Sequence, residues 1–236
     1  MTRLLTASAL LLAIGSGPAG AADSTSTAAD TGAKATPAPA AAAAAAPSAA
    51  AAPAGEVAVL QTAQGTIVIK FHEKDAPKTT ANFKKLVKDK FYDGTYFHRV
   101  ITNFMIQGGD PNTKNADPND DGVGGPGYTV PAEIKLPHLR GSVATARQGD
   151  QVNPTKASSG SQFFICVTAL PSLDKGGYTV FGEVISGMDA VDKIVALAVD
   201  PTTPKGPSGP NPGKKALVTK VTLEPLSKWQ KAAGAK

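Results

Sequence analysis

Two runs, FHRVI at residues 97–101 and FMIQGGD at residues 104–110, predict neighbouring β-strands rich in large apolar side chains. They place one cation, Arg99, and one amide, Gln107, among those apolar neighbours. The head of such an arginine must reach water, a carboxylate or a ligand. A third run, GSQFFIC at residues 160–166, has the same character. If the three runs meet in space, they form an apolar pocket with polar donors at its rim, which is the general form of a small-ligand or peptide site.

Outward from these runs, short strands alternate with turns and only two helices are expected. The first helix begins near Asp75, a plausible N-cap, with Pro77 in the first turn, and the second spans residues 188–196. Strands are expected at residues 57–62, 66–71, 96–101, 105–109, 128–130, 142–146, 163–167, 179–184 and 216–223. This pattern indicates a closed β-barrel rather than a parallel α/β sheet.

The N-terminus has the pattern of an export signal. A basic start precedes an uncharged apolar run at residues 4–14, which is too short to span a bilayer, and AGA at residues 19–21 fits a small-residue cleavage site. We therefore predict a secretory signal peptide at residues 1–21, with no integral membrane span after its cleavage. The alternatives are a soluble helix and an uncleaved tether.

The composition divides the rest of the chain into three parts. Residues 22–54 are almost wholly Ala, Pro, Ser, Thr, Gly and Asp, and they contain no apolar side chain larger than alanine. Such a segment cannot bury enough surface to offset its ordering entropy, so we predict a disordered linker. Residues 55–226 suit one domain, and residues 227–236 are expected to be a polar C-terminal tail.

Charge, cysteine and histidine content argue against several function classes. The formal net charge of +5 is spread along the chain, which predicts no nucleic-acid partner. The single cysteine, Cys166, lies in an apolar run, which favours a buried thiol. The histidines lack metal-ligand spacing, and we expect no metal and no cofactor. His98 is expected to make a structural hydrogen bond on the strand face opposite Arg99.

An acidic loop gives the one calcium-like pattern. DPNDDG at residues 117–122 opens like an EF-hand loop, but Tyr128 stands where the bidentate glutamate is needed. We expect a solvated, turn-rich loop.

Six motifs in order resemble the cyclophilin family of peptidyl-prolyl cis-trans isomerases, over roughly residues 57–225. They are APKTTANF at 76–83, FHRVI at 97–101, FMIQGGD at 104–110, GSQFFI at 160–165, VFGEV at 180–184 and GMD at 187–189. The resemblance implies a mainly β fold: a closed eight-stranded antiparallel barrel capped by two α-helices. It also implies isomerase activity on Xaa-Pro bonds, and partners that are proline-containing segments of unfolded or exported proteins. We expect the protein to be a monomer.

The resemblance also assigns roles to individual residues. Arg99 would be the key catalytic residue, with Gln107 and Phe104 beside it. The residues implied to bind substrate are Met105, Phe164, Gln162, Leu173, Tyr178, Ala146, Arg147 and Gly122. Taken without the resemblance, Arg99 could equally form an ion pair on a strand face, and the aromatic residues could be plain core.

The chain departs from the best-known eukaryotic pattern at three places. Ser172 stands where that pattern has tryptophan, Tyr178 where it has histidine, and Arg147 where it has asparagine. Because that tryptophan and asparagine contribute to cyclosporin contacts, we expect weak cyclosporin sensitivity with isomerase activity retained. These features and the signal peptide resemble the bacterial exported branch, which places the protein in the periplasm or cell envelope of a bacterium.

Two other function classes compete with an isomerase. One is a non-catalytic proline-peptide-binding chaperone or scaffold module, against which Arg99 speaks. The other is a structural protein of the cell envelope, against which the aromatic motifs speak.

Overall fold

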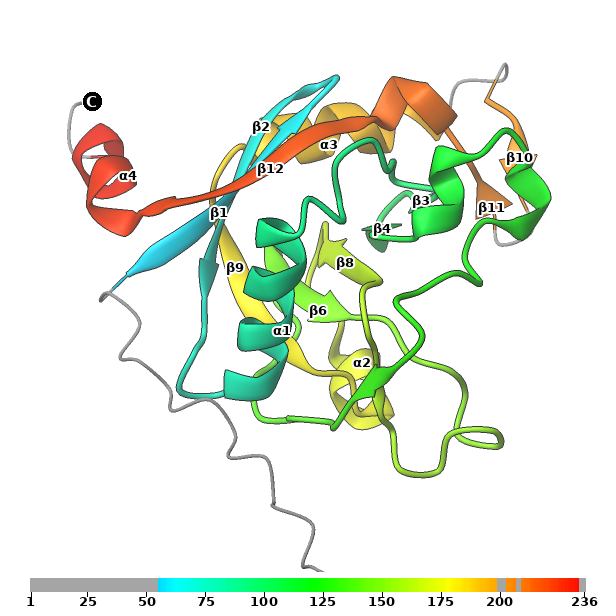
Figure 1. Ribbon diagram of the computed structural model, residues 1–236, viewed down its shortest axis with the longest axis horizontal. Helices are drawn as coiled ribbons and strands as arrows, with labels where there is room; N and C mark the ends of the chain where they lie inside the picture. Colours follow the sequence, from blue (N-terminus) through cyan, green and yellow to red (C-terminus); the bar gives the residue numbers. More distant parts are fainter. Residues whose placement is uncertain (1–54, 199–202, 207–208, 234–236) are drawn as a thin grey trace, which may run out of the picture. The chain divides into compact units, whose positions relative to one another are not determined.

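The structure, a computed structural model, describes residues 55–198, 203–206 and 209–233. The predicted signal peptide and linker lie outside the described residues. Eight strands form one antiparallel sheet in the order β12-β1-β2-β9-β6-β8-β4-β3 (Figure 1). They are β1 (Glu56–Thr62), β2 (Gly65–Phe71), β3 (Arg99–Ile101), β4 (Met105–Gly108), β6 (Ser142–Thr145), β8 (Phe163–Cys166), β9 (Val180–Ser186) and β12 (Val218–Pro225).

The sheet curls until its two ends meet. A single bridge joins Tyr96, just before β3, to Leu217, just before β12. Beside it, the Phe97 amide donates to the Ala216 carbonyl at 3.2 Å. The predicted eight antiparallel strands are therefore confirmed. The barrel, however, is closed only by this short seam of Tyr96–Phe97 with Ala216–Leu217, and no full ladder forms between β3 and β12.

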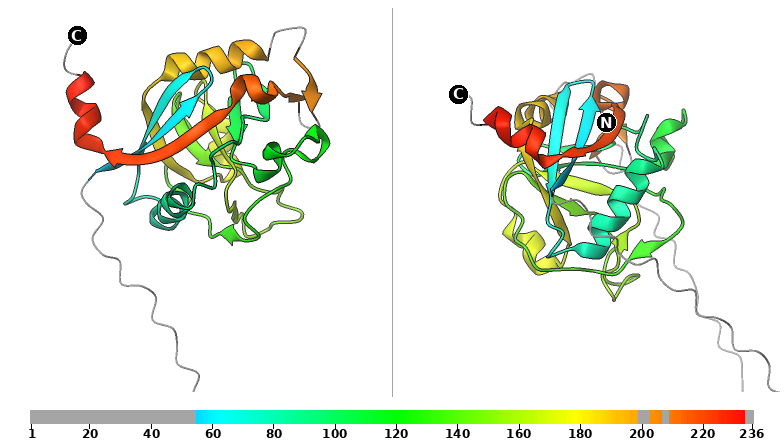
Figure 2. Two further views of the ribbon diagram at one scale, coloured as in Figure 1. Left: turned by 45° about the horizontal axis from the view of Figure 1, so that its top comes forward. Right: turned by 60° about the vertical axis from the view of Figure 1, so that its left-hand side comes forward.

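The two longest helices, α1 (Pro77–Lys88) and α3 (Met188–Leu197), lie on opposite sides of the curled sheet, as predicted for the helical caps (Figures 1 and 2). None of the helices in the described part of the chain is long and apolar enough to cross a bilayer. The smaller elements are α2 (Pro171–Gly176), α4 (Leu226–Ala233), the pairs β5 (Thr129–Val130) with β7 (Ser158–Ser159) and β10 (Lys205–Gly206) with β11 (Gly209–Pro210), and three 3-10 turns, η1 (Pro111–Lys114), η2 (Pro118–Asp120) and η3 (Gly213–Ala216).

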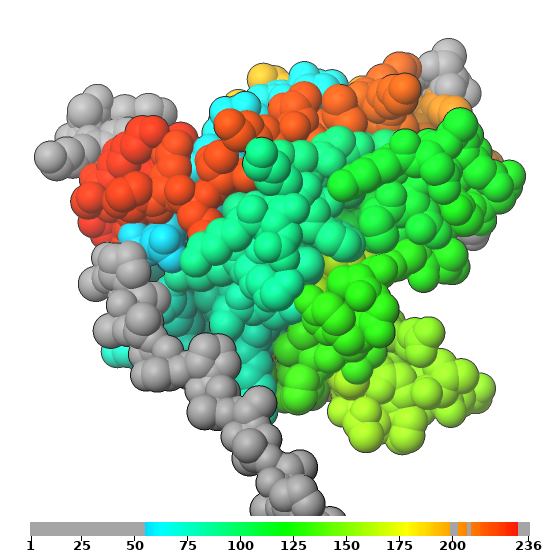
Figure 3. Space-filling model, viewed as in Figure 1, coloured from blue at the N-terminus to red at the C-terminus, as the bar shows by residue number. Residues whose placement is uncertain are grey.

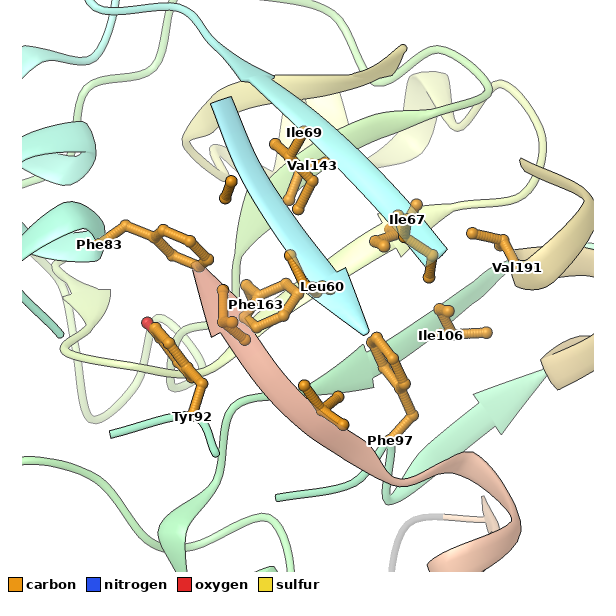
Figure 4. Packing of buried hydrophobic residues seen from close by; sticks show 14 of the residues in the cluster. Leu60, Ile67, Ile69, Phe83, Tyr92, Phe97, Ile106, Val143, Phe163 and Val191 are labelled. Atoms are coloured by element: carbon orange, nitrogen blue, oxygen red, sulfur yellow. The ribbon is translucent and has the colours of Figure 1, made fainter. Parts of the chain in front are cut away.

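The barrel interior holds the main core, with Phe163 among several rings (Figure 4). Its ring centroid lies 5.5 Å from that of Phe83 and 5.8 Å from that of Tyr92. Edge-to-face contacts of this kind add to the stabilisation that comes from burying the ring area. The strands of the pocket region bury their other face as well, which explains why runs such as FFIC are apolar throughout instead of alternating.

Helix α4 covers an apolar patch on the outside of the β1–β2 hairpin. Val57, Val59 and Val68 are buried there against Leu226 and Trp229. Because α4 supplies this cover, β1 is buried on both faces. The helix occupies most of the segment that was expected to be a polar tail.

Helix α1 is capped from a distant segment. Its N-cap residue is Ala76, which makes no side-chain capping bond, so the prediction that Asp75 caps the helix is wrong. The carboxylate of Glu133 instead accepts hydrogen bonds from the Lys78 amide at 3.1 Å and the Thr79 amide at 2.9 Å. These amides are among the unpaired donors of the first helical turn, and a negative charge there is favoured by the helix dipole.

Replacing Glu133 with alanine is expected to lower the free energy of unfolding by about 1 kcal/mol, the usual value of a lost cap. Chemical denaturation of the variant and the wild type measures this difference. Asp75→Ala is the matched control, since its side chain makes no capping bond. Equal losses in the two variants would contradict the assignment of the cap to Glu133.

Candidate active site

A pocket of about 160 Å³ opens on the outer face of the strands that carry the three opening motifs. It lies where β3, β4 and β8 run side by side, next to the end of β6 and the segment around α2. The lining residues are Arg99, Phe104, Met105, Gln107, Ala146, Arg147, Phe164, Leu173 and Tyr178. The structure thus brings together nine of the predicted site residues, while Gln162 and Gly122 lie next to this pocket, in the wall of a second hollow.

Strand register explains why these residues meet. Arg99 on β3 is paired with Gln107 on β4, and Gln107 is paired with Phe164 on β8. Paired residues point to the same face of a sheet, so their side chains stand in one row across three strands. The neighbours Ile106 and Ile165 point the other way, into the barrel core.

The Arg99 guanidinium is partly buried at one side of the pocket. Its Nη1 lies 3.4 Å from Gln107 Oε1, and the guanidinium carbon is 5.8 Å from the centroid of the Phe104 ring. Burial lowers the pKa of Arg99, and the nearby Tyr178 opposes this shift. Arginine stays protonated despite such a shift because its ordinary pKa is so high, so the pocket holds a positioned cation with N–H donors.

Hydrogen bonds link Arg99 to a buried carboxylate that the sequence analysis missed. Gln107 Nε2 donates to Gln162 Oε1 at 3.0 Å. Gln162 Nε2 donates in turn to the carbonyls of Gly122 at 3.0 Å and Gly124 at 2.8 Å.

The amides of those two glycines donate to Asp110, whose side chain ends the chain of bonds. The Gly124 amide lies 3.1 Å from Asp110 Oδ2, the Gly122 amide donates to the same oxygen, and Asp110 is 0% exposed. Asp110 was visible in the sequence as the acidic residue that ends FMIQGGD. Nothing local, however, shows that it meets amides twelve and fourteen residues later.

A second hollow, of about 860 Å³, adjoins the pocket. The glycine-rich segment 122–127 lines one side, and residues 146–148 and 152–153 line part of the other. It is visible as the notch between the green and yellow-green surfaces in Figure 3. Ala146 and Arg147 line both hollows, so an extended peptide could run from one into the other along this segment.

His138 and Asp174 support the pocket from behind, and the sequence analysis missed both. The His138 ring stacks on Phe164 with centroids 5.9 Å apart, and its Nδ1 lies 2.7 Å from Asp174 Oδ1. Hydrogen bonds from the His138 side chain and backbone lower the pKa of Asp174. Asp174 lies next to Leu173 on α2, so the pair fixes the wall that Leu173 provides. The two residues are too far apart in the chain for any spacing rule to pair them.

His98 differs from its predicted role. It is 3% exposed, lies just before β3 and is not among the residues that line the pocket, and neither ring nitrogen makes a hydrogen bond among the described residues. The predicted structural hydrogen bond is therefore wrong. Burial lowers the pKa of His98, against the attraction of the Asp110 and Asp121 carboxylates.

This lowered pKa predicts how stability depends on pH. The folded protein keeps His98 neutral, while the unfolded chain binds a proton near the ordinary histidine pKa of about 6.5. Stability is therefore full above that pH and falls as the pH drops through it, because protonation favours the unfolded chain. Urea unfolding at about pH 7.5 and about pH 5.5 should show a smaller decrease for His98→Gln than for the wild type. An equal decrease in both proteins would contradict the assignment to His98.

The acidic loop is less solvated than expected, since Asp121 is buried. Its Oδ2 accepts hydrogen bonds from the Tyr96 hydroxyl and from Asn211 Nδ2, both at 2.7 Å. Burial and this hydrogen bond raise the pKa of Tyr96 to about 12. Asp121 therefore ties the loop to the seam of the barrel. The thiol of Cys166 is buried as predicted, and burial raises its pKa to about 12.

Residues 57–212 match the family model described as "Cyclophilin type peptidyl-prolyl cis-trans isomerase/CLD". The chain belongs to this family. A peptidyl-prolyl cis-trans isomerase of Synechococcus elongatus is 48% identical over 151 residues, which are 60% of this chain and 94% of that protein. A peptidyl-prolyl cis-trans isomerase of Helicobacter pylori is 40% identical over 142 residues, which are 58% of this chain and 78% of that protein.

Solved cyclophilin structures share the fold. A cyclophilin type peptidyl-prolyl cis-trans isomerase of Cryptosporidium parvum superposes with a TM-score of 0.59 at 27% identity, covering 72% of this chain and 98% of that one. A structure of the same protein in the presence of the dipeptide Ala-Pro gives 0.58 at 26% identity, with 71% and 98% covered. The predicted family, fold class and enzyme class are thereby confirmed: this chain is a cyclophilin-type isomerase.

Proposed function

We propose that this cyclophilin-type isomerase accelerates rotation about Xaa-Pro bonds in exported proteins and so assists their folding. The pocket carries the proposal, because it pairs an apolar space of about 160 Å³ with a fixed guanidinium at its side. The signal-peptide pattern at residues 1–21 supports export to the periplasm or cell envelope of a bacterium. The protein acts as a monomer in this proposal.

The chemistry needs no nucleophile. The Xaa-Pro amide resists rotation by about 18–20 kcal/mol, because the nitrogen lone pair is delocalised into the carbonyl. Uncatalysed exchange between cis and trans therefore takes tens to hundreds of seconds. As the bond twists, the lone pair localises on the prolyl nitrogen, which becomes a better hydrogen-bond acceptor than in either planar form.

In this proposal, Arg99 uses that difference. With the prolyl ring against Phe104, Met105 and Phe164, the guanidinium beside the pocket donates to the prolyl nitrogen of the twisted amide. This bond is stronger in the twisted state than in either ground state, which is the condition for catalysis. The link to Gln107 limits the orientations of the guanidinium, so little reorganisation is needed during the reaction.

The peptide on either side of the proline has two contact surfaces in this proposal. Gln107 and the backbone of Ala146 and Arg147 hold the residues next to the ring, and the second hollow receives the extended chain. Gln162 and Gly122 take part there, as members of the wall that the two hollows share.

A protease-coupled prolyl isomerisation assay on the full chain tests the activity. Acceleration proportional to enzyme concentration is expected with an Ala-Pro tetrapeptide. No acceleration, together with binding of the same peptide in a calorimetric titration, would replace the enzyme by the non-catalytic proline-peptide-binding module.

Export is tested separately. The full chain with a C-terminal affinity tag is expressed in a Gram-negative host, and the protein from its periplasmic fraction is sequenced from the N-terminus. The expected first residue is Ala22, which follows the predicted cleavage site. An intact Met1 start on protein found in the cytosolic fraction would contradict the proposed location.

A further inference from the structure

The Arg147 side chain is almost entirely enclosed by the chain itself, although it lines both hollows. It is only 5% exposed. Its Nη1 donates to the Gln148 carbonyl at 2.8 Å and pairs with Asp150 Oδ1 at 2.6 Å, and its Nη2 donates to the Gly176 carbonyl. The guanidinium carbon lies 4.7 Å from the centroid of the Tyr178 ring. These contacts engage Nη1 and Nη2, while Nε is buried and makes no hydrogen bond among the described residues.

The same contacts join two separate segments of the pocket wall. Arg147 follows β6, whereas Gly176 and Tyr178 lie at and just beyond the end of α2. Between them, Gly177 turns the backbone with φ of 71°, a conformation that other residues rarely adopt. The Gly177 amide donates to the Leu173 carbonyl at 3.1 Å, and the Arg147 cation adds a side-chain hydrogen bond to the same turn at Gly176.

Tyr178 is the residue that this arrangement fixes. One side of its ring meets the guanidinium, and the ring also makes an edge contact with Phe164, with centroids 5.9 Å apart. A further edge contact joins it to His138, at 6.3 Å. Phe164 and Tyr178 touch each other and both line the small pocket, so the position that Tyr178 holds against Phe164 sets how much room the pocket leaves for a ring.

We propose that Arg147 is a positioning residue that holds Tyr178 in place, and that it thereby sets the size of the small pocket and the selectivity for the five-membered prolyl ring. The inference rests on the proposed function, because it takes proline as the occupant of this pocket. Arg147 acts through Tyr178 and as part of the wall that the two hollows share. Its side chain does not bind the peptide directly.

Arginine suits this task better than lysine. A planar guanidinium can lie over an aromatic ring and still direct its N–H groups, in its own plane, at two carbonyls and a carboxylate. An ammonium has no flat face and cannot make this set of contacts at once. The exposed partner Asp150, whose side chain is 62% exposed, adds little to the arrangement because water screens the pair.

The test compares the binding of two peptides that differ in one methylene. One is an Ala-Pro tetrapeptide, and the other has six-membered pipecolic acid in place of proline. An extra methylene in a well-fitted pocket weakens binding roughly tenfold or more. Dissociation constants for the full chain are measured by NMR titration, for the wild type, Arg147→Ala, Arg147→Lys and the control Asp150→Ala.

The preference for proline is the ratio of the two dissociation constants, and it is expected to be the same in the wild type and in Asp150→Ala. Arg147→Ala should reduce this ratio roughly fivefold to tenfold, chiefly by binding the larger ring better. The ratio for Arg147→Lys should lie between those of the wild type and Arg147→Ala. In a Tyr178→Leu background, Arg147→Ala should change the preference no further, because the two residues act as one unit. Melting temperatures recorded beside the titrations identify any variant that is partly unfolded.

Three results would overturn the inference. One is a preference unchanged in Arg147→Ala, another is a change that simply adds to that of Tyr178→Leu, and the third is an equal loss of affinity for both peptides. If the wild type binds proline peptides selectively but gives no turnover, the proposed isomerase function fails while the role of Arg147 stands. A wild type that binds neither peptide would refute both.

Discussion

Arg99→Ala is expected to lower kcat/KM for prolyl isomerisation by roughly 10²-fold or more, the cost of removing one preorganised electrostatic donor from a transition state. The fold should survive, because the guanidinium is only partly buried and stands at the pocket, outside the barrel core. The loss should appear mainly in kcat, since the interaction with the prolyl nitrogen strengthens only as the amide twists. The protease-coupled assay and a peptide titration separate the two quantities.

Two variants make the interpretation specific. Arg140→Ala removes another partly exposed arginine, whose Nη2 contacts both oxygens of Asp192 at 2.9 and 2.8 Å, and it should leave turnover unchanged. Arg99→Lys keeps the charge but loses the planar fork that aligns with Gln107, and it should recover only part of the rate. Near-wild-type turnover in a folded Arg99→Ala protein would refute the mechanism.

The parts of the fold that follow from local periodicity could be predicted from the sequence. Residues 57–62 and 66–71 are β-branched runs around a short turn, and they form the β1–β2 hairpin within one residue of the expected ends. Helix α4 could not be predicted in the same way. Half of the residues in its segment are polar or charged, and it is held by contacts of Leu226 and Trp229 with a patch more than 150 residues earlier in the chain. The prediction of the α1 cap failed for the same reason. The residue that caps the helix, Glu133, lies more than 50 residues away in the sequence, whereas the predicted one, Asp75, is adjacent to the helix.

In the candidate site, too, the residues on strands could be predicted from the sequence, and those held by long-range contacts could not. Arg99, Gln107 and Phe164 belong to motifs on strands, and a two-residue period is enough to put them on one face once the strands are paired. Asp110 and the His138–Asp174 pair act through partners that only the folded chain supplies. The sequence shows which residues could do the chemistry, whereas the groups that hold them in place depend on long-range contacts.

Gly124→Ala tests whether that supporting layer matters for catalysis. A Cβ atom at Gly124 would lie 2.2 Å from Asp110 Oδ1 and 2.6 Å from Asn112 Oδ1, so either the loop or the carboxylate must move. The hydrogen bonds that the Gly122 and Gly124 amides donate to Asp110 would then be lost or strained. A buried carboxylate without its donors costs roughly 1–3 kcal/mol of stability. Because the same loop holds Gln162, and through it Gln107 and Arg99, kcat/KM should also fall by about tenfold or more.

The neighbouring glycine provides the matched control. A Cβ at Gly125 would meet nothing closer than Ser161 Oγ at 4.0 Å, and neither glycine has a positive φ. Gly125→Ala should therefore keep both stability and turnover, although it changes the same loop by the same methyl group. Urea unfolding and the isomerase assay on both variants decide the matter. If Gly124→Ala and Gly125→Ala had the same stability and the same kcat/KM, the hydrogen bonds to Asp110 would not position Arg99. If Gly124→Ala lost stability but kept its kcat/KM, the role of Asp110 would be limited to holding the loop.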